Sequence, residues 1–548
     1  MKRKNILLIL LITLAVLNTR AVPALRQLQT HVQPDGTELS VMLCGDEHLH
    51  YYMTADGQRM ELCSDGFLRP LSQKVMETRI NRLKTQHTSA PKRTPGKPGV
   101  TTGEHRGLFI LVEFPDIKFS RPDIKTVYDS ICNMQGYATP PYKGSVRDYF
   151  LEQSDGQFDL TFDIVGPVKV SNNESRYGMN SGWGIDDMVP ELVLEVIDLV
   201  KDSVNFHRYD WDDDGECDQV FLLYAGYGEA QGGPEWTIWP SEGQLSRQRG
   251  GLKCPVIDGV TIDTFALSCE LKGKTGTRID GIGTICHEFS HCLGLPDFYN
   301  TSDMDDFCMD AYELMDVGAY NGGSYQPAAY TGYERWFCGW REPIELTDAQ
   351  VIDHWQPLEL GGPTYIIYNA GDRKRNEYYL LDNRQYVGFD ASLYSAGLVV
   401  MHVDYDEQAW TSNQVNSNKK HQRLTLIPAD NIKDVTTCNT DAFPYTYLNG
   451  QRTLDSLTNS SRPQATVFTK NTDGSNFLNR PIYNIRQNDD LTMSFAFLQR
   501  ATPTSIWPQQ ADNLPRLPQQ RRYDLNGRHA ATGRSGIVIE QGKKIINH

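Results

Sequence analysis

Residues 280–297, DGIGTICHEFSHCLGLPD, decide the fold of the central part of the chain. On a helix, His287 and His291 lie one turn apart and project from one face, so both imidazoles can reach one ion. Gly294 is placed to end this helix, because glycine readily adopts the positive φ that reverses the chain. Asp297 follows three residues later and returns a carboxylate to the same ion. The stretch therefore predicts a helix that carries two of the three ligands of a metal.

This ligand set is typical of catalytic zinc, which is held by three protein ligands and keeps a fourth position open for water. Glu288 lies beside the ligands, placed to take a proton from that water. An HExxH match arises by chance in roughly two of a hundred chains of this size, and the added Gly and Asp lower that to about one in ten thousand. The alternative, a helix whose histidines merely lie on the surface or in a core, is disfavoured by that rarity.

A second signal is the stretch ELMD at residues 313–316, whose Met lies eighteen residues after Asp297. In metzincin peptidases, a tight turn bearing a Met forms the floor beneath the metal. A lone Met is more often ordinary core, but behind a zinc helix the turn is the favoured interpretation, with Met315 structural. Cys286 and Cys292 flank the histidines but point elsewhere on the helix, so we expect them in the core.

Several blocks resemble the immune inhibitor A family of secreted bacterial metallopeptidases, a branch of the metzincins. The most specific are GTICHEFSHCLGLPDFY at 283–299 and YELMDVGAY at 312–320. LFILVEFPDIKF at 108–119 and NEYYLLDNRQYVGFD at 376–390 extend the similarity over most of the chain. PDGTELSVMLCGDEHLHYYMTADG at 34–57 is similar to the start of the family's propeptides.

The resemblance implies a role for each residue of the motif. His287, His291 and Asp297 would hold Zn²⁺, with Asp297 in the place of the third His of the commoner metzincin pattern. Glu288 would be general base toward the attacking water and general acid toward the leaving amine. The implied fold is α+β: a metzincin-like zinc peptidase domain with a twisted mixed sheet and an active-site helix, followed by a β-sandwich domain.

The start of the chain has the pattern of a secretory signal peptide. MKRK at 1–4 is basic, residues 6–17 are apolar except for one Thr, and small residues follow at Ala21 and Ala24. The apolar run is too short to span a bilayer, and the basic start argues against the alternative of a buried N-terminal helix. No later stretch approaches the length of a transmembrane helix, so the protein is expected to be secreted or at the cell surface.

Composition limits the remaining possibilities. The chain has 548 residues, of which 39% are apolar and 22% charged, as in a globular protein of several domains. Its net charge of −16, without a long Lys/Arg run, argues against nucleic acid as a partner. The eleven cysteines are scattered without a CxxC pair, so neither a disulfide scaffold nor a thiolate zinc site is indicated.

Changes in composition and periodicity divide the chain into five expected segments. The strands expected between residues 34 and 86 are broken by Asp-Gly turns, and TSAPKRTPGKPGVTTG at 88–103 reads as a cleavable linker. The segments are a signal peptide at 1–24, a propeptide-like domain with linker at 25–103, the zinc peptidase domain at 104–345, the β-sandwich at 346–500, and a linker with a short tail at 501–548. The tail resembles the C-terminal ends of many exported Bacteroidetes proteins and is a candidate for attachment to the cell surface.

Residues 210–218, DWDDDGECD, predict a calcium loop. Asp210, Asp212, Asp214 and Asp218 occupy places 1, 3, 5 and 9, with Gly at place 6 for the sharp turn. Hard oxygen ligands at this spacing suit Ca²⁺, and carboxylates this close repel one another without a cation. Place 12 lacks the Glu of an EF-hand, so the loop is not one. The alternative is an acidic turn between two elements.

These observations predict a secreted zinc-dependent endopeptidase that acts on proteins or peptides and is made as a latent precursor. Cys44 or Asp46, in LCGDE, is a candidate for the open zinc position, although a cysteine buried in a small β domain is the commoner case. The alternatives are a surface adhesion or binding protein with a vestigial zinc site, and a metal-dependent hydrolase of non-peptide substrates. An intact Glu288 argues against the first, because a vestigial site is free to lose its base.

Overall fold

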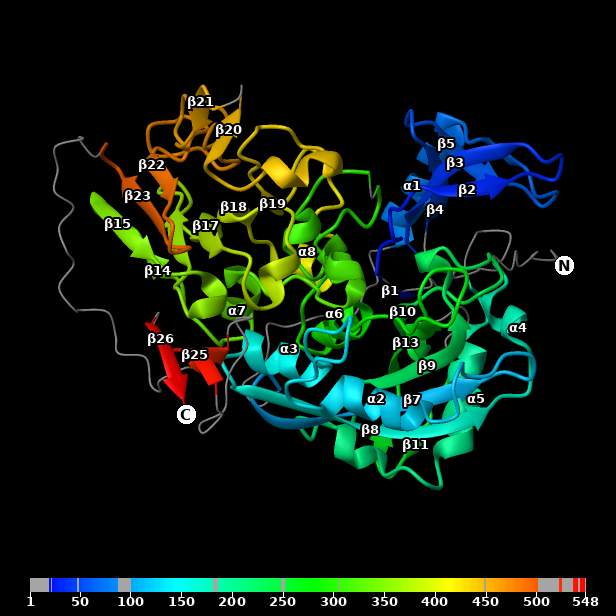
Figure 1. Ribbon diagram of the computed structural model, residues 1–548. Coiled ribbons are helices and arrows are strands. Elements are labelled where there is room, and N and C mark those ends of the chain that lie inside the picture. The colour runs from blue at the N-terminus through cyan, green and yellow to red at the C-terminus, as the bar shows by residue number, and fades with distance from the viewer. Residues whose placement is uncertain are drawn as a thin grey trace, which may run out of the picture.

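The structure is a computed structural model, which shows three packed parts (Figure 1). It describes residues 22–46, 49–86, 100–180, 186–247, 252–303, 305–447 and 450–500, together with short strands at 19–20, 522–524, 536–540 and 543–547. Most of the expected signal peptide, the greater part of the linker and much of the tail therefore lie outside the described residues.

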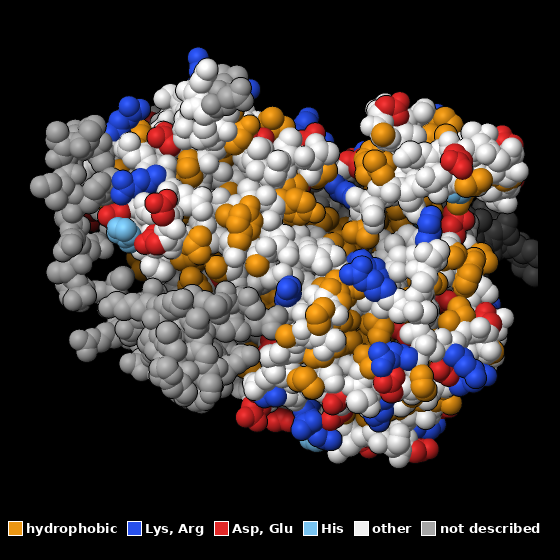
Figure 2. Space-filling view, viewed as in Figure 1, with side chains coloured by type: hydrophobic (Ala, Val, Ile, Leu, Met, Phe, Trp, Pro, Cys, Tyr) orange, Lys and Arg blue, Asp and Glu red, His pale blue; other side chains and the backbone are white. Residues whose placement is uncertain are grey.

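The N-terminal part, residues 22–86, is built on a five-stranded antiparallel sheet in chain order. Its strands are β2 (Gln29–Val32), β3 (Glu38–Gly45), β4 (His50–Thr54), β5 (Arg59–Leu62) and β6 (Leu68–Pro70). The predicted turns lie between them, with positive φ at Gly36, Gly57 and Gly66. In the space-filling view this part forms a separate lobe, divided from the C-terminal part by a notch (Figure 2).

The prediction of strands as far as residue 86 was wrong for its last segment. Gln73–Gln86 is helix α1. Met76 and Ile80, one helical turn apart, pack with Cys44 and Tyr51 in a small core. The helix has little amphipathic patterning of its own, so packing on the sheet rather than local sequence determines it.

The central part, residues 100–343, is organised by a six-stranded mixed sheet in the order β1-β10-β13-β9-β7-β8. The strands are β1 (Thr19–Arg20), β10 (Ser241–Gln244), β13 (Thr264–Leu271), β9 (Val220–Tyr227), β7 (Gly103–Glu113) and β8 (Phe158–Lys169). The four strands from β13 to β8 are parallel, β10 pairs antiparallel with β13, and the edge strand β1 pairs antiparallel with β10. The mixed α/β architecture expected for the central part is present.

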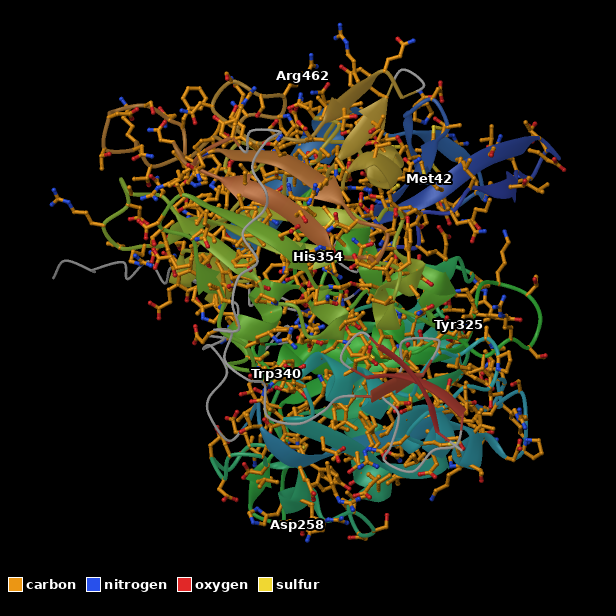
Figure 3. The ribbon with its side chains drawn as sticks, turned by 60° about the vertical axis from the view of Figure 1, so that its left-hand side comes forward. Met42, Asp258, Tyr325, Trp340, His354 and Arg462 are labelled. Carbon is orange, nitrogen blue, oxygen red and sulfur yellow. The ribbon has the colours of Figure 1, made fainter. Side chains whose placement is uncertain are left out.

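Alternate residues of β7 face two cores. Phe109 and Leu111 pack with α2 (Ile124–Asn133), α3 (Val146–Gln153) and α6 (Gly283–Cys292) on one face. Leu108 and Ile110 pack with α5 (Val189–Val200) on the other. Apolar residues that recur every three or four positions predict a helix from residue 189 to about residue 200, and α5 has these bounds, with Pro190 in its first turn. Asp258, between β11 (Val256–Ile257) and β12 (Val260–Thr261), lies at the end of the molecule opposite the N-terminal part (Figure 3).

The C-terminal part, residues 344–500, contains a five-stranded and a three-stranded sheet. The first is ordered β14 (Ile344–Glu345), β16 (Tyr365–Tyr368), β17 (Glu377–Arg384), β18 (Gly397–Asp404) and β19 (Leu424–Leu426). The second is ordered β15 (Gln350–Trp355), β23 (Met493–Phe497) and β22 (Ile482–Gln487). Both sheets contribute to one core, in which Trp355, Tyr365 and Phe495 meet edge to face. Short apolar segments between Asn/Asp/Gly turns predict strands at 365–368, 378–382, 398–403, 423–427 and 491–497, and all five are observed within two residues of these bounds.

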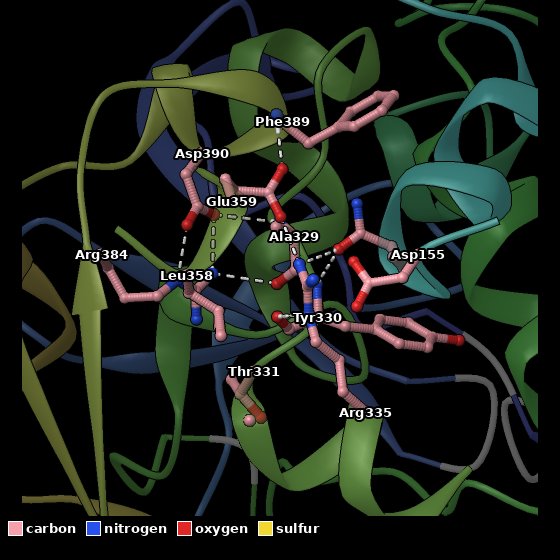
Figure 4. A network of polar contacts seen from close by, with 12 residues as sticks. Asp155, Ala329, Tyr330, Thr331, Arg335, Leu358, Glu359, Arg384, Phe389 and Asp390 are labelled. Carbon is pink, nitrogen blue, oxygen red and sulfur yellow. Dashed lines mark hydrogen bonds and ion pairs between the residues drawn. The ribbon is translucent and has the colours of Figure 1, made fainter. Parts of the chain in front are cut away.

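Buried arginines join the C-terminal part to the central part (Figure 4). Arg384 of β17 is fully buried; it donates two hydrogen bonds of 2.6 Å to Asp390 and further bonds to the carbonyls of Ala329 and Tyr312. Arg335 of α7 (Gly332–Phe337) pairs with Glu359. Truncating one partner of a buried ion pair typically costs several kcal/mol, because the other charge stays buried. The two parts therefore behave as one packed unit, and Trp340 lies where they meet (Figure 3).

None of the helices in the described ranges is long and apolar enough to cross a membrane. All eleven cysteines are free thiols. The tail forms a small antiparallel sheet of β24 (Arg522–Asp524), β25 (Gly536–Glu540) and β26 (Lys543–Asn547).

Candidate metal centre

Helix α6 carries the HExxH segment at the centre of the molecule, between the sheet and the C-terminal part (Figure 1). It ends at Cys292, and Gly294 follows with a φ of +90°, which reverses the chain as predicted. The start of the helix packs closely on the chain after residue 316: a Cβ on Gly283 would lie 1.8 Å from the carbonyl oxygen of Ala319. Gly283 therefore fixes how deeply the helix is seated.

The structure brings His287, His291 and Asp297 together. The Oδ1 atom of Asp297 lies 3.2 Å from Nε2 of His287 and 3.6 Å from Nε2 of His291. One ligand atom from each residue lies within 4.8 Å of the others, and all three side chains are buried. This donor set and convergence fit a metal ion with two nitrogen ligands and one oxygen ligand.

Backbone carbonyls orient both imidazoles. Nδ1 of His287 lies 2.9 Å from the carbonyl oxygen of Leu314, and Nδ1 of His291 lies 2.8 Å from that of Leu295. A carbonyl oxygen can only accept, so each Nδ1 must carry the proton and each Nε2 presents its lone pair to the shared space. This arrangement fixes the tautomer that a metal ligand needs.

Asn413 holds the third side chain of the cluster. Its Nδ2 donates to Oδ2 of Asp297 at 2.5 Å, and its Oδ1 accepts from the Asp297 backbone N–H at 2.7 Å. Burial would raise the pKa of Asp297, but the facing imidazoles and this amide outweigh burial and hold the pKa below its usual value. Asn413 is 116 residues away in sequence, outside the family blocks named above, and sequence reasoning missed it.

Two hydrogen bonds connect the turn at residues 313–316 to the residues of the metal cluster. Leu314 accepts from His287, and the carbonyl of Met315 accepts from the N–H of Phe298, directly after Asp297. Met315 is fully buried in the main core, as expected of a structural residue. Cys286 and Cys292 also contribute to that core, as predicted.

Glu288, which lies between the two histidines in the sequence, is fully buried. Its backbone carbonyl accepts a hydrogen bond from the side-chain amide of Gln219. Burial first, and then the nearby Asp280, Cys269 and Glu288, raise the pKa of the Tyr320 phenol. Sequence reasoning missed Tyr320, although it ends the block YELMDVGAY. The Tyr320 hydroxyl donates a hydrogen bond of 2.6 Å to the backbone carbonyl of Pro23. It can therefore donate to a main-chain carbonyl at this place.

The acidic loop at 210–218 gathers three of its four predicted ligands. Carboxylate oxygens of Asp210, Asp212 and Asp214 lie within 4.8 Å of one another. The carboxylate of Asp218 instead accepts from the N–H of Trp211 at 2.6 Å. Burial, with the neighbouring carboxylates, raises the pKa of Asp218 to about 7. The loop thus concentrates negative charge, while Asp218 has a structural partner.

The candidate latency residues lie inside the N-terminal part. Cys44 is fully buried in the small core beside α1, and its Sγ lies 3.9 Å from the carbonyl oxygen of Met42. Burial raises the pKa of this thiol to about 12, so it is not a ready thiolate. Asp46 is buried and accepts from the N–H of Leu49 at 2.9 Å. These contacts favour the core interpretation of Cys44.

Removing the support of Asp297 should weaken the metal site without removing a ligand. In Asn413→Ala, the N–H and Oδ2 of Asp297 lose their hydrogen bonds to the Asn413 amide. Loss of a group that hydrogen-bonds to a metal ligand typically lowers metal affinity about 10- to 100-fold. Competition with a chromophoric chelator measures this affinity. Asn418→Ala, in the exposed part of the same loop, is the matched control. Equal affinity in both variants would contradict the role given to Asn413.

Comparisons with known proteins agree with the geometry. Residues 100–341 match the immune inhibitor A peptidase M6 catalytic domain. The chain is 26% identical over 272 residues to the pre-pro-metalloprotease PrtV of Vibrio cholerae, which covers 42% of this chain and 29% of that protein. It is 24% identical over 253 residues to immune inhibitor A of Bacillus thuringiensis, which covers 38% and 36%. The chain thus spans about a third of the length of these curated relatives. Residues 100–341 thus match the catalytic domain of the immune inhibitor A (M6) peptidase family, which confirms the family resemblance.

Proposed function

We propose that the protein is a secreted zinc-dependent endopeptidase. The observation that carries this proposal is the convergence of His287, His291 and Asp297 beside Glu288, within a region that matches a peptidase family. The donor set of two imidazoles and one carboxylate suits zinc, and three protein ligands leave one position for water.

The residues of α6 supply binding and proton transfer. Zinc held there would lower the pKa of a water molecule and polarise the scissile carbonyl. Glu288 takes the proton of the attacking water and passes it to the leaving amine. Tyr320 is positioned to donate a hydrogen bond to a main-chain carbonyl of a bound peptide, as it does to Pro23.

The sheet edge supports a peptide as the substrate. Strand β10 lies near the edge and runs antiparallel to β13, and it pairs in turn with the short strand β1. Edge strands bind extended chains through main-chain hydrogen bonds, with side chains read by adjoining pockets. This argues against a hydrolase of small non-peptide substrates. A binding protein with a vestigial site is disfavoured by the intact, buried Glu288.

The fold assignment and segment boundaries are part of the proposal. The turn at Met315 beneath the histidines supports a metzincin-like peptidase domain at 104–345. The core shared by two sheets supports a β-sandwich at 346–500. We assign residues 1–24 to a signal peptide and 501–548 to a linker with a tail that is a candidate for surface attachment.

The mechanism predicts a specific phenotype for Glu288→Gln. The substitution removes the proton acceptor but leaves all three proposed ligands, so zinc content and melting temperature should stay near those of the parent. The rate of peptide cleavage should fall more than the roughly hundred- to ten-thousand-fold usual for one acid–base group, because this carboxylate serves both proton transfers. His287→Ala is the contrasting variant and should lose metal and activity together. Cleavage by Glu288→Gln at near-parent rate would require another base.

The N-terminal part is proposed to be a propeptide, removed by a cut within residues 88–106. The linker composition supports this, and so do the hydrogen bonds of Arg59 in the N-terminal lobe to Asp303 and Asp305 of the central part. N-terminal sequencing of the active form should find a new terminus in this range. A fully active protein that retains residues 25–87 covalently would remove the argument for latency.

Calcium is proposed to bind the loop at Asp210, Asp212, Asp214 and Asp218. An ion that binds only the folded state raises the melting temperature; at 100 times its Kd the stabilisation is about 2.7 kcal/mol. We expect the melting temperature of chelator-treated protein to rise with millimolar Ca²⁺, and Asp212→Asn to reduce that rise. Asp202→Asn, at an exposed neighbouring position, should keep it. A melting curve indifferent to Ca²⁺ would favour the acidic-turn interpretation.

A further inference from the structure

The N-terminal part rests on the central part through a small apolar core. Leu43 of β3 and Tyr52 of β4 pack there against Ala230 and Trp239 of the central part. The N–H of Leu25 donates to the carbonyl of Ala230 at 2.8 Å beside this core. Figure 1 shows the N-terminal sheet next to the end of the central part that carries β10. These contacts hold the proposed propeptide on the precursor.

Next to this core, His50 of β4 meets a carboxyl group of the central part. Nε2 of His50 lies 3.5 Å from Oε1 of Glu229, in the short 3-10 helix η3 (Glu229–Gln231). The imidazole also stacks on the ring of Trp239, with the ring centroids 4.9 Å apart. The side chains of His50 and Glu229 are only 14% and 4% exposed. The contact is therefore part of the interface and is largely shielded from water.

The geometry of this contact requires one proton. Nδ1 of His50 lies 3.2 Å from the carbonyl oxygen of Asp46, which can only accept, so Nδ1 carries a hydrogen. Nε2 is then the atom that faces Glu229. If neither Nε2 nor the carboxylate held a proton, two sets of lone pairs would face each other across the interface. One proton on either group replaces this repulsion with attraction.

The surroundings of Glu229 favour its protonated form. Burial first, and then the nearby Asp186, raise the pKa of this carboxyl well above its usual value, and Glu235 adds to the effect. The amide of Asn180 opposes it by donating to both carboxyl oxygens, at 3.2 and 3.1 Å. Glu229 is therefore the group that holds the proton while the two parts are together.

The other titratable groups at this place do not supply a competing proton near neutral pH. Burial, assisted by Arg79, lowers the pKa of His50 to about 4, although the carbonyl of Asp46 opposes the shift. Burial first, and more weakly Glu229, raise the pKa of the Tyr52 and Tyr224 phenols, so both stay neutral.

Separation of the two parts changes the number of protons bound. In water an imidazole has a pKa of about 6.5 and a carboxyl of about 4.3, so above about pH 6.5 the separated groups hold no proton. The raised pKa of Glu229 thus stabilises the complex at low pH, and this stabilisation is lost as the pH rises. The lowered pKa of His50 cancels the gain below about pH 6.5, where the free imidazole takes up a proton. Association therefore binds one proton only above about pH 6.5, and Kd rises about tenfold for each further pH unit.

We propose that His50 and Glu229 form a pH-sensitive contact, which holds the N-terminal part on the central part at mildly acidic pH and weakens as the medium becomes alkaline. A propeptide that has been cut in its linker is then released more readily above about pH 6.5. The proposal rests on the proposed maturation of the precursor and adds the condition that controls release.

The affinity of the two parts for each other tests the proposal in the full chain. The Glu288→Gln protein, used to avoid self-digestion, receives a site for a sequence-specific protease within residues 88–99 and is cut there after folding. Analytical ultracentrifugation of the cut protein at several concentrations gives the Kd of the N-terminal part at each pH. Between about pH 6.5 and 8.5 this Kd should rise at least about thirtyfold.

The variant Glu229→Gln isolates the contact. Its amide mimics the protonated carboxyl and can donate to Nε2 of His50 at every pH, so Kd should change less than about threefold over the same range. Two controls accompany it. Arg59→Gln loses the hydrogen bonds to Asp305 and should raise Kd by a similar factor at every pH. Glu235→Gln, at an exposed neighbouring position, should keep the pH dependence of the parent.

Two results would overturn the proposal: a Kd that does not change with pH in the parent, or the same pH dependence in the parent and Glu229→Gln. If the parts of the parent stay together at every pH, the comparison is made in the Arg59→Gln protein, whose complex is weaker. The measurement records binding and not cleavage. Persisting peptidase activity of Glu288→Gln, or none in the uncut or cut parent, would contradict the proposed mechanism or function without changing this result.

Discussion

Two imidazoles and a carboxylate must be buried face to face, and the rest of the structure depends on this constraint. Oδ1 of Asp297 lies within 3.6 Å of both Nε2 atoms, at the centre of the protein. Such a cluster is costly unless every remaining polar atom has a partner and a cation compensates the charge. The chain meets this requirement by bringing two backbone carbonyls and the amide of Asn413 to the outer side of the cluster.

These supports come from distant segments, which explains why the C-terminal part is packed so firmly on the central part. Asn413 reaches Asp297 only because the sheet containing β17 and β18 shares its core with α6. Arg384 forms a buried ion pair with Asp390 and also donates to the backbone carbonyls of Ala329 and Tyr312 (Figure 4). These contacts fix the position of the C-terminal part on the central part near the turn at Met315. The β-rich part therefore contributes residues to the candidate site rather than acting as an independent module.

Local features of this architecture could be predicted from the sequence, and non-local ones could not. The bounds of α5, the reversal at Gly294 and the strand β16 follow from periodicity and backbone preference within a few residues. Helix α1 was missed because its stability comes from packing on a sheet. Asn413 was missed because its role depends on a partner 116 residues away in the sequence, which no local pattern encodes.

The central claim is that one zinc ion joins His287, His291 and Asp297. Anomalous scattering recorded above and below the zinc edge, on crystals of the purified protein, tests it most directly. We expect one strong zinc peak per chain, about 2.0–2.2 Å from Nε2 of both histidines and from a carboxylate oxygen of Asp297. Zinc bound elsewhere, or an empty cluster in protein that still cleaves peptides after strong chelation, would contradict a catalytic zinc site at these three residues.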